Sequence, residues 1–599
     1  MCGIIGYLGH QSAKDILLEG LKKLEYRGYD SAGLCVLQGG HFFIDKKVGP
    51  VVQLEQSVVN QEIVGTIGIA HTRWATHGAP SENNAHPHVD CCAQLAVVHN
   101  GIIENYQALK EVLISEGHRF QSETDSEVLA HLIEKFYDGN LETAVAKALA
   151  LVEGSYGLVA LSIKENKLVA VRQSSPLIVG VGEGETFVAS DIPAILNHTK
   201  QVIYLKDNDL AVIDSQGYRI QNLAGQIMDR QIEEVKLNIE QIEKKGFKHF
   251  MLKEIFEQPQ SLANVLAGRV KDGQIKLSID LKSDNLKRII IAACGTSWHS
   301  ALIAKYLLES IAKIPVEIDY ASEFRYRQPL VSNFDLFIAI SQSGETADTL
   351  AALREAKQQG AQTIAIVNVV GSTVTREVDS GIYLHAGPEI GVASTKAFTA
   401  QVTALILLAL YLRQQSGQSL DSELLADLSR LPIVVEETLG LADQVNVLAE
   451  QFNQAANFLY LGRGLNFPVA LEGALKLKEI SYIHAEGYPA AEIKHGPIAL
   501  VDNDMPVVFL ATKNELSDKI ISNIQEIKAR GGRIIAIVDQ DYEYIAELAD
   551  YLIKVPVVNV FLSPIINVIP LQLLAYYIAD QKGLDVDKPR NLAKSVTVE

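Results

Sequence analysis

The sequence predicts an α+β sandwich followed by two α/β domains, each with a doubly wound parallel sheet. Short strands and helices are mixed up to about residue 222, whereas beyond about residue 250 strands alternate with longer helices, as in parallel α/β sheets. The second pattern also occurs twice, because Gly360–Asn368 is paralleled by Gly531–Asp539. A chain of 599 residues is too long for one core and should divide into several domains.

The elements of the first domain follow from local patterns. Gly3–Leu8 should form a strand and Ala13–Leu24 an amphipathic helix. Thr66–Ala70 and Leu95–Val98 are apolar runs typical of strands, each ending in polar residues. Thr124–Glu127 has the capping-box pattern, which predicts a helix over 128–137.

Two hairpin-like segments, 157–172 and 177–189, complete this domain. Strands and helices in separate runs suggest two sheets with helices outside, an αββα sandwich. Charged residues then crowd 229–258, which we interpret as a linker region with helical character. The predicted divisions are a first domain at 1–240, a linker at 241–249, α/β domains at 250–430 and 431–590, and a tail at 591–599.

Composition predicts a soluble cytoplasmic protein. The net charge of −19 argues against nucleic acid or an anionic membrane as the main partner. Five scattered cysteines without CxxC spacing fit a reducing compartment. The N-terminus lacks the pattern of a signal peptide, and the longest apolar stretch, Ala404–Leu412, is too short to span a bilayer.

Cys2 is the first candidate catalytic residue. Once Met1 is removed, it offers both a thiol and a free α-amine. The amine titrates near pH 7.7–8.0 and a thiol near about 8.5, so the amine can take the thiol proton. Cysteine is also a small apolar residue that suits a buried strand, and position alone leaves both interpretations open.

Polar residues after the predicted strands add further candidates. Arg73 could hold a carboxylate through two parallel hydrogen bonds, although a surface ion pair is the simpler interpretation. The Asn100 amide and the Gly101 N–H could form an oxyanion hole, although Asn-Gly is also a strong turn dipeptide. Asp125 could bind an amine or serve the helix dipole.

Together these segments resemble the class II glutamine amidotransferase domain, whose fold begins with an N-terminal nucleophile. The resemblance implies that Cys2 attacks the glutamine amide with its own α-amine as base, while Asn100 and the Gly101 N–H stabilise the oxyanion. The matching segments are Met1–Ile4, Tyr26–Gly33, His71–Gly78, Asn83–His88, His99–Gly101 and Thr124–Asp125.

The same resemblance implies the remaining roles in this site. Arg73 would bind the substrate α-carboxylate and Asp125 its α-amine. Thr76 and His77 would line the pocket, and Trp74 would act as a gate. An enzyme that kept Met1 would have no free α-amine at Cys2.

A metal site is a competing interpretation of His86, His88, Asp90, Cys91 and Cys92. Adjacent cysteines cannot easily both bind one tetrahedral ion, and the resembling family uses no metal here. We therefore expect no metal and no other cofactor.

The first α/β domain contains a predicted phosphate site. The apolar strand Leu336–Ile340 runs into Ser341–Thr346 and then a helix over Ala347–Gln358. Hydroxyls, a glycine and free helix amides can together cradle a phosphate without a lysine. Ser297 follows a neighbouring strand and could face the same ligand. The corresponding segment of the second domain, Val507–Thr512, lacks the Ser-rich loop, so we expect one phosphate site.

Three further candidates are ambiguous by themselves. Glu472, Lys476 and Glu479 share one helix face, where a solvated salt-bridge ladder is the simpler interpretation. His495 could be structural, and Lys594 lies in the tail, where a solvated lysine is ordinary.

The two α/β domains resemble sugar isomerase (SIS) domains. The resemblance implies phosphate binding by Ser297, Ser341, Gln342, Ser343 and Thr346, with Val392 lining the sugar pocket. The matching segments are Ser341–Thr346, Glu389–Lys396, Lys476–Ser481, Lys494–Pro497 and Pro589–Glu599.

Chemical roles in the sugar site are likewise implied. His495, reaching in from a neighbouring subunit, would open the sugar ring, and Lys594 would form a Schiff base with the open ketose. Glu479 would move the proton between C1 and C2 with Lys476 assisting.

Over essentially the whole chain, the combined motifs resemble a family of homodimeric enzymes that use glutamine and fructose 6-phosphate. The implied products are glucosamine 6-phosphate and glutamate, at the first step of amino-sugar biosynthesis, with ammonia passed internally. Two alternatives differ in class. Another class II amidotransferase would need a pyrophosphate- or ATP-cleaving motif that is not evident, and a sugar-phosphate sensor would need a DNA-reading segment.

Overall fold

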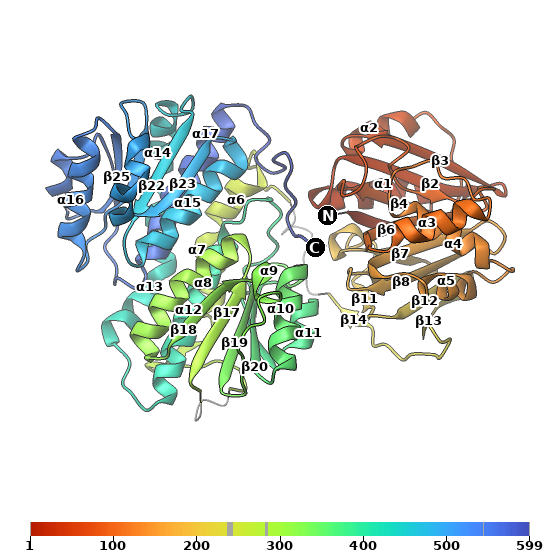
Figure 1. Ribbon diagram of the computed structural model, residues 1–599, viewed down its shortest axis with the longest axis horizontal. Coiled ribbons are helices and arrows are strands. Elements are labelled where there is room, and N and C mark those ends of the chain that lie inside the picture. The colour runs from red at the N-terminus through yellow and green to blue at the C-terminus, as the bar shows by residue number, and fades with distance from the viewer. Residues whose placement is uncertain (1, 236–242, 282–285, 543, 598–599) are drawn as a thin grey trace. The chain divides into compact units, whose positions relative to one another are not determined.

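The computed structural model describes residues 2–235, 243–281, 286–542 and 544–597, and Figure 1 shows their elements. Contacts divide the chain into two compact units, Met1–Glu243 with Ala593–Glu599 and Lys244–Leu592. Met1, the first two residues of the predicted linker 241–249 and the last two of the predicted tail 591–599 lie outside the described residues.

The first unit contains an eight-stranded sheet with β1 near its centre. β1 has the predicted bounds, Gly3–Leu8, and pairs antiparallel with both β10 and β4. In spatial order the strands are β14 (Glu233–Glu234), β11 (Gln201–Tyr204), β9 (Ile178–Val181), β10 (Thr186–Ala189), β1, β4 (Ile67–Arg73), β2 (Ser31–Gln38) and β3 (His41–Val48).

A six-stranded antiparallel sheet packs against the first. In spatial order its strands are β13 (Gly217–Asn222), β12 (Asp209–Asp214), β8 (Lys167–Gln173), β7 (Gly154–Ser162), β6 (Leu95–Ile103) and β5 (His88–Val89). The helices of this unit are α1 (Ala13–Leu24), α2 (Val51–Val58), α3 (Tyr106–Ser115), α4 (Glu127–Phe136) and α5 (Leu141–Leu149).

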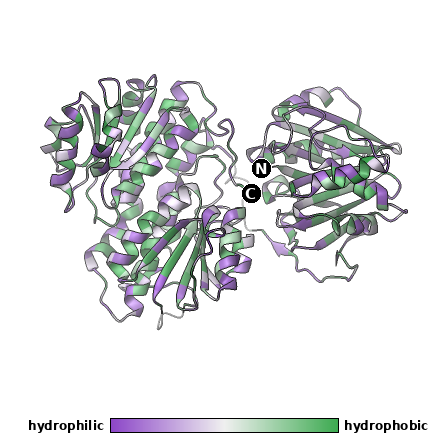
Figure 2. Cartoon of the chain, in the orientation of Figure 1, coloured by the Kyte–Doolittle hydropathy of each residue, from purple (hydrophilic) through white to green (hydrophobic). Residues whose placement is uncertain are grey.

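Three apolar clusters confirm the predicted αββα sandwich. The inner cluster joins side chains of both sheets, such as Ile4 and Ile69 on one and Val98 and Val159 on the other. A second cluster packs α1 and α2 on the outer face of the eight-stranded sheet, and a third packs α3, α4 and α5 on the outer face of the six-stranded sheet. Figure 2 shows hydrophobic residues interspersed with hydrophilic ones along both the strands and the helices.

The helix predicted over 128–137 is present as α4 (Glu127–Phe136), but two local polar signals have a different structural role from their simplest interpretation. Asn100 and Gly101 do not form a turn, because β6 continues through them to Ile103. The capping box is also absent: Ser126 is the N-cap of α4 and makes no side-chain cap. Thr124 instead lies 3.0 Å from His88 Nε2, and the Glu127 carboxylate accepts from the N–H groups of Gln121 and Ser122 at 2.7 Å each. Thr124 and Glu127 therefore bond to residues outside the helix and do not form the capping box.

The second unit contains two parallel five-stranded sheets with the same topology, as the internal repeat predicts. Each has its strands in the order 2-1-3-4-5, the doubly wound arrangement. The first sheet is β18 (Val316–Tyr320), β17 (Arg288–Ala293), β19 (Asp335–Ser341), β20 (Gln362–Val367) and β21 (Ser380–Tyr383). The second is β23 (His484–Pro489), β22 (Asn457–Gly462), β24 (Pro506–Leu510), β25 (Arg533–Asp539) and β26 (Tyr551–Val555). A hairpin, β15 (Val270–Lys271) with β16 (Gln274–Ile275), precedes them.

Helices join these two sheets into one apolar core, which includes Ile289 and Ile338 of the first and Tyr460 and Val508 of the second. The helices are α6 (Phe250–Phe256), α7 (Gln258–Leu266), α8 (Gly295–Leu307), α9 (Ala321–Phe324), α10 (Ala347–Gln358), α11 (Thr373–Glu377), α12 (Lys396–Gln415), α13 (Ser422–Leu439), α14 (Ala442–Glu450), α15 (Asn466–Ser481), α16 (Ser517–Lys528) and α17 (Ser563–Gln581). α13 runs without interruption through residues 430 and 431, where the sequence places a domain boundary.

The start of this unit is better packed than its charge suggests. Met251, Lys253, Glu254 and Ile255 of α6 are all buried, so the part of the predicted linker region 229–258 that forms α6 is packed into this unit. Glu254 tolerates burial because its carboxylate accepts from the N–H groups of Ile390 and Gly391.

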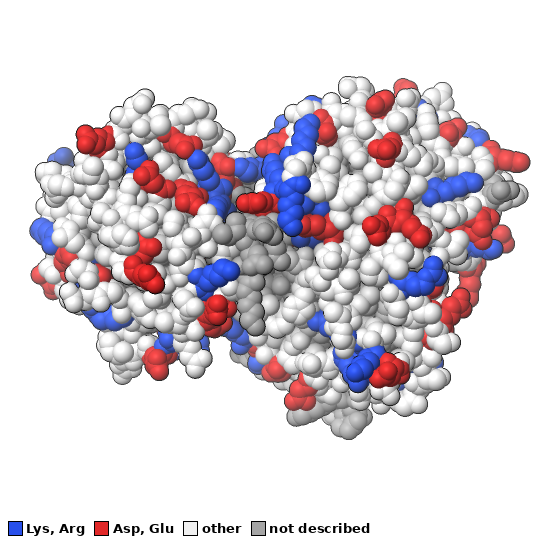
Figure 3. Space-filling model, turned by 180° about the vertical axis from the view of Figure 1, so that it is seen from behind, with Lys and Arg blue, Asp and Glu red and all other residues white. Residues whose placement is uncertain are grey.

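One helix among the described residues, α12, is long and apolar enough to cross a bilayer, but 83% of its most apolar window is buried inside the protein. It is therefore a core helix by its packing. Over the face drawn in Figure 3, acidic and basic side chains are intermingled.

Candidate active sites

Cys2 lies directly before β1, beside the end of β4. Its Sγ accepts a hydrogen bond from the Trp74 N–H at 3.2 Å and lies 3.6 Å from the Trp74 carbonyl oxygen. Burial raises the pKa of the Cys2 thiol, while the Trp74 N–H and the Arg73 charge act in the opposite direction. A buried thiol of raised pKa needs a base beside it to react near neutral pH.

The side chain of Asn100 faces Cys2 from the other sheet. Its Nδ2 donates to the Cys2 carbonyl oxygen at 3.1 Å, and its Oδ1 lies 3.0 Å from His71 Nε2. Gly101 follows with φ of 129°, and a Cβ there would lie 2.0 Å from the Ser155 carbonyl oxygen. Only glycine therefore fits beside Asn100 at this point of β6.

A cluster of four buried histidines, His71, His86, His88 and His99, supports Asn100. The rings of His71 and His86 stack with centroids 4.1 Å apart, and His88 lies edge-on to His86 at 4.5 Å. Burial lowers the pKa of all four, to about 3 for His71. Neutral rings result, so each can both donate and accept hydrogen bonds.

Arg73, at the end of β4, is 3% exposed and partly unsatisfied. Its Nη2 donates to the carbonyl oxygens of His77 and Gly78, whereas Nη1 is buried without a hydrogen-bond partner among the described residues. Burial lowers the pKa of Arg73, and Cys2, Asp30 and Asp125 counteract it. A buried guanidinium with an unused donor is suited to a carboxylate ligand.

Asp125 is also buried. Its Oδ2 accepts from the Ile103 N–H at 2.8 Å, and its Oδ1 lies 3.9 Å from His77 Nδ1. The other residues implied for this pocket are more open: Thr76 is exposed, and His77 and Trp74 are half-buried. Trp74 makes an edge-on contact with Tyr29 at 5.9 Å.

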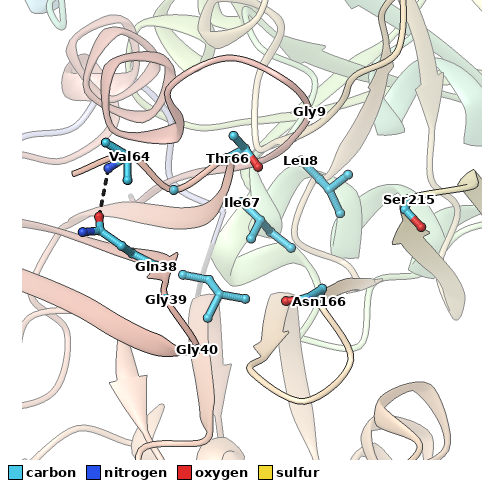
Figure 4. A pocket seen from close by; sticks show the side chains of 12 residues that line it. Leu8, Gly9, Gln38, Gly39, Gly40, Val64, Thr66, Ile67, Asn166 and Ser215 are labelled. Atoms are coloured by element: carbon cyan, nitrogen blue, oxygen red, sulfur yellow. Dashed lines mark hydrogen bonds between the residues drawn. The ribbon is translucent and has the colours of Figure 1, made fainter.

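A separate pocket of about 440 Å³ lies at the opposite end of the same strands (Figure 4). Leu8 ends β1 there, and Gln38 accepts from the Val64 N–H at 2.9 Å. Leu8 lies six positions along the chain from Cys2, a distance of about 20 Å in an extended strand. This pocket is therefore not part of the Cys2 site.

The second unit places the predicted phosphate residues at the switch point of its first sheet. β17 and β19 are the first and third strands of this sheet in sequence order, yet they are adjacent and parallel. Helix α8 follows β17, and α10 follows β19. Ser297 lies in the first turn of α8, and Ser341–Thr346 connects β19 to α10. Doubly wound sheets bind ligands at this place, outside the carboxyl ends of the strands.

The loop after β19 is held in shape by its own hydroxyls and by glycine. Ser341 Oγ accepts from the Gly344 N–H at 2.9 Å, and Ser343 Oγ from the Glu345 N–H at 3.2 Å. Gly344 has φ of 66°, and a Cβ there would lie 2.1 Å from Ser372 Oγ. Gln342, Ser343 and Thr346 are half-buried.

Ser297 and Val392 are nearly buried in the same unit. Ser297 Oγ accepts from Gln401 Nε2 of α12 at 3.0 Å, which leaves its own proton available. Val392 is 9% exposed, and its N–H donates to the Asp587 carbonyl oxygen at 3.1 Å.

The corresponding switch point of the second sheet is filled by the protein itself. Asn466, Thr512 and Asn567 are buried there and bond to one another: Thr512 Oγ1 lies 3.0 Å from both amide nitrogens. This arrangement supports the expectation of a single phosphate site.

Glu472, Lys476 and Glu479 do not form a solvated ladder. Glu472 and Lys476 are 0% exposed, with Lys476 Nζ 3.4 Å from Glu472 Oε1 and 2.6 Å from Glu479 Oε2. Burial lowers the pKa of Lys476, but the two carboxylates outweigh it and the net shift is upward.

Two residues of α8 complete this network, and the sequence interpretation missed both. Thr296 Oγ1 donates to Glu472 and accepts from Lys476 Nζ at 3.0 Å, while His299 Nδ1 lies 2.7 Å from Glu472 Oε2. Gln401, which holds Ser297, was missed too. Their partners lie between 104 and 180 positions away, so no spacing signal could have found them.

The remaining two candidates, His495 and Lys594, are less buried than Lys476. His495 is exposed at the end of the turn Ala490–His495. Lys594 is half-buried and groups with the first unit.

Two family models match the chain. A glutamine amidotransferase domain matches residues 71–197, and a SIS domain matches residues 284–411 and again 451–579.

Relatives of full length are about half identical to the chain. Glutamine–fructose-6-phosphate aminotransferases [isomerizing] of Chlorobaculum tepidum, Thermus thermophilus and Aquifex aeolicus are 53%, 52% and 50% identical, with 100% of both chains covered in each case. Among solved structures, the C-terminal domain of glucosamine-fructose-6-phosphate aminotransferase from Francisella tularensis is 44% identical, with a TM-score of 0.55. That match covers 58% of this chain and 100% of the other.

Proposed function

The chain belongs to the glutamine–fructose-6-phosphate aminotransferase (isomerizing) family, and on this basis we propose that it makes D-glucosamine 6-phosphate and L-glutamate from D-fructose 6-phosphate and L-glutamine. The observation that carries the proposal is the 53% sequence identity, over the full length of both chains, to a relative of this name. The glutamine amidotransferase domain and both SIS domains are present in the chain. We assign residues 1–240 to glutamine hydrolysis, 250–430 and 431–590 to the sugar, 241–249 to a linker and 591–599 to a tail.

Glutamine hydrolysis begins at Cys2. The α-amine freed by removal of Met1 takes the thiol proton, and the sulfur adds to the side-chain amide carbon of glutamine. The negative oxygen that forms accepts hydrogen bonds from Asn100 Nδ2 and the Gly101 N–H. Collapse breaks the C–N bond, the ammonium base returns the proton and ammonia leaves. Water then hydrolyses the thioester to glutamate.

The rest of the pocket orients glutamine. Arg73 has an unused buried donor for the α-carboxylate, and Asp125 offers a buried carboxylate for the α-amine. Thr76 and His77 line the pocket. Trp74, whose backbone contacts the thiol, acts as the gate through which ammonia leaves.

The sugar phosphate is held at the first switch point by Ser297, Ser341, Gln342, Ser343 and Thr346, beside Val392. Neutral hydroxyls and helix N-terminal amides supply this anion site, consistent with the acidic net charge of the chain. Neither half-reaction, as proposed, requires a metal or an organic cofactor.

Amination and isomerisation use the side chains around the sugar. His495, supplied by the partner subunit of a homodimer, opens the ring, and Lys594 forms a Schiff base at C2 of the ketose with release of water. Ammonia then adds at C2 and displaces the Lys594 amine. Glu479 then carries the proton between C1 and C2. Lys476 Nζ lies 2.6 Å from Glu479 Oε2 and so helps to position this carboxylate.

Ammonia passes between the two sites without entering solvent, where it would be protonated or lost. We propose a cytoplasmic homodimer that interacts with small molecules and has neither nucleic acid nor a membrane as its partner. The reaction is the first step of amino-sugar biosynthesis.

Incubation with glutamine and fructose 6-phosphate, followed by product identification, tests the reaction. We expect glucosamine 6-phosphate and glutamate in equal amounts; glutamate without amino sugar would contradict the proposal. Cys2→Ala should lose all use of glutamine, whereas Lys594→Ala should keep glutamine hydrolysis and lose amination. Intact-mass analysis of active protein should find Met1 removed, and active protein that retains Met1 would refute the amine as base.

The gate role of Trp74 has its own test. In Trp74→Ala, glutamate should form faster than glucosamine 6-phosphate, because ammonia escapes. Equal rates of the two products would contradict the role.

A further inference from the structure

Four side chains with metal-binding atoms converge in the first unit, away from Cys2. Cys91 lies in the turn between β5 and β6, His118 in the loop after α3, and His131 and Glu134 on one face of α4. The Cys91 sulfur, one nitrogen of each histidine and one Glu134 oxygen all lie within 4.8 Å of one another. Three separate segments of chain contribute to this cluster.

The distances within the cluster are close to those of a tetrahedral site. With Zn–S of about 2.3 Å and Zn–N or Zn–O of about 2.0–2.1 Å, tetrahedral angles separate sulfur from nitrogen by about 3.5 Å and nitrogen from oxygen by about 3.3 Å. Cys91 Sγ lies 3.6 Å from His131 Nδ1 and 3.8 Å from His118 Nδ1. Glu134 Oε2 lies 3.2 Å from His131 Nδ1 and 2.8 Å from His118 Nδ1. Three of these four distances agree with those around a bound ion, and the fourth, from Glu134 Oε2 to His118 Nδ1, is shorter by about half an ångström.

We propose that Cys91, His118, His131 and Glu134 bind one divalent ion of the zinc class. A thiolate and a carboxylate carry two negative charges, which balance the ion, and two neutral imidazoles complete a set that zinc prefers. The ion would fasten the β5–β6 turn and the loop after α3 to α4, a structural role that is separate from glutamine hydrolysis.

The surroundings of His131 support this assignment. The side chain is 1% exposed, and its Nε2 has no hydrogen-bond partner among the described residues but lies 3.7 Å from Glu127 Oε1. Histidines that bind a metal through one nitrogen commonly direct the other toward a carboxylate, which fixes the ring. Glu127 is itself held by the Gln121 and Ser122 N–H groups.

The structure separates this site from the metal pattern considered in the sequence. His86 and His88 belong to the buried stack beside Asn100, and Asp90 accepts from the N–H groups of Gln94 and Leu95. Cys91 alone joins the new cluster. Its neighbour Cys92 is exposed and is not one of the four clustered residues, so it provides a matched control.

Cobalt(II) titration of the chelator-treated, full-length protein under reducing conditions tests the proposal. Wild type and Cys92→Ser should each bind one Co²⁺ per chain, with the visible bands of tetrahedral cobalt and a sulfur-to-cobalt charge-transfer band that Zn²⁺ abolishes. Cys91→Ser should lose the charge-transfer band. His118→Gln should keep that band but bind at least about 10-fold more weakly.

Two results would overturn the proposal: absence of a one-to-one tetrahedral complex in wild type, which would make the cluster a hydrogen-bonded group only, or an unchanged charge-transfer band in Cys91→Ser. Retained glutamine hydrolysis in Cys91→Ser shows that the variant is folded. As a second measurement, Zn²⁺ should raise the melting temperature of wild type and Cys92→Ser but not of Cys91→Ser. An equal rise in all three would contradict the site.

Discussion

The Asn100 amide can serve an oxyanion only if its nitrogen faces the thiol, and His71 determines that orientation. His71 Nε2 lies 3.0 Å from two acceptors, the His99 carbonyl oxygen and Asn100 Oδ1, so the ring proton must lie on Nε2. The opposite nitrogen, Nδ1, is buried without a partner among the described residues. The ring therefore acts as a fixed donor.

Replacing His71 with Phe should impair glutamine hydrolysis through Asn100. The variant keeps an aromatic ring against His86 but loses the N–H, so the Asn100 amide is free to rotate. We expect kcat to fall by about 10- to 100-fold, below the 10²- to 10³-fold loss typical for removal of an oxyanion donor. KM for glutamine should change little, because Arg73 and Asp125 remain. Steady-state kinetics measure both values.

The double variant His71→Phe/Asn100→Ala provides the control. If His71 acts through Asn100, the double variant should be no slower than Asn100→Ala alone. Additive losses, or a rise in KM without a fall in kcat, would contradict the positioning role.

Gly344 should be indispensable for binding the sugar phosphate. Alanine there would need φ of 66° and would place its Cβ 2.1 Å from Ser372 Oγ, so the loop after β19 must shift. We expect Gly344→Ala to bind fructose 6-phosphate at least about 10-fold more weakly by calorimetry. Gly360→Ala has the same kind of backbone (φ of 94°) but no close contact, and it should bind like wild type. Equal binding by both variants would contradict the prediction.

At the residue scale, what the sequence predicted depended on local segments. The loop Ser341–Thr346 became a candidate because strand, hydroxyls and helix are contiguous in the sequence, and Cys2 because the segments around it resemble a known domain. His71, His299 and Gln401 escaped notice because their roles arise from side chains on other elements. The spacing of Lys476 alone favoured a solvated position, whereas its side chain is 0% exposed in the structure.

Two helices, α8 and α15, are held together by a buried charged network. Glu472 contacts Thr296, His299 and Lys476. Because its side chain is 0% exposed, water cannot take the place of a partner that is lost. Breaking a buried ion pair leaves an uncompensated charge, which typically costs about 3–5 kcal/mol.

Glu472→Gln should therefore reduce the free energy of unfolding of the second unit by about 3 kcal/mol, measured by urea denaturation. Lys305→Gln breaks an i,i+4 pair with Glu309 in which both side chains are over 40% exposed, and should cost less than about 1 kcal/mol. Similar losses in the two variants would mean that the buried network contributes no more than a surface pair.

The buried histidines of the first unit should make it sensitive to acid. Burial lowers the pKa of His71, His86, His88 and His99, whereas unfolded histidines titrate near about 6.5. Below that pH the unfolded chain binds more protons, so the free energy of unfolding falls as the pH falls. For His71 the loss continues down to a pKa of about 3.

Unfolding by urea at pH 7.5, 6.5 and 5.5 checks this dependence. Each such histidine contributes at most about 1.4 kcal/mol per pH unit below 6.5. His86→Gln, which cannot titrate, should flatten the dependence, whereas the exposed control His41→Gln should not. If the free energy of unfolding of His86→Gln fell more steeply with falling pH than that of wild type, the prediction would be contradicted.

At the scale of elements, regular apolar patterns were reliable and polar signals were not. Gly3–Leu8, Ala13–Leu24 and Ala347–Gln358 have the predicted bounds. The capping-box pattern located α4 to within one residue, but its own hydrogen bonds do not form, and Asn-Gly lies within β6, since tertiary hydrogen bonds and sheet pairing are stronger than a local preference. The burial of the charged helix α6 was not predicted for the same reason. The carboxylate of Glu254 in α6 accepts from backbone N–H groups about 135 residues away.

Over the whole molecule, the repeat predicted two sheets of one topology but not how they share a core. Both sheets contribute to a single apolar cluster, and α13 bridges the position where the sequence suggests a boundary. Duplication gave two switch points, which the chain treats differently. The first has a hydroxyl-rich loop, whereas Asn466, Thr512 and Asn567 fill the second.

This asymmetry predicts one sugar phosphate per chain. Calorimetric titration with fructose 6-phosphate should saturate at a ratio of one, because the buried amides and hydroxyl at the second switch point bond to one another and fill the space that an anion would need. Ser341→Ala, in the first loop, should weaken this single binding event. Thr512→Val, which leaves the two asparagines short of a partner, should lower stability by about 1–3 kcal/mol without changing the ratio or the affinity. A ratio of two in wild type, or weaker binding in Thr512→Val than in Ser341→Ala, would mean that the second copy also binds the sugar phosphate.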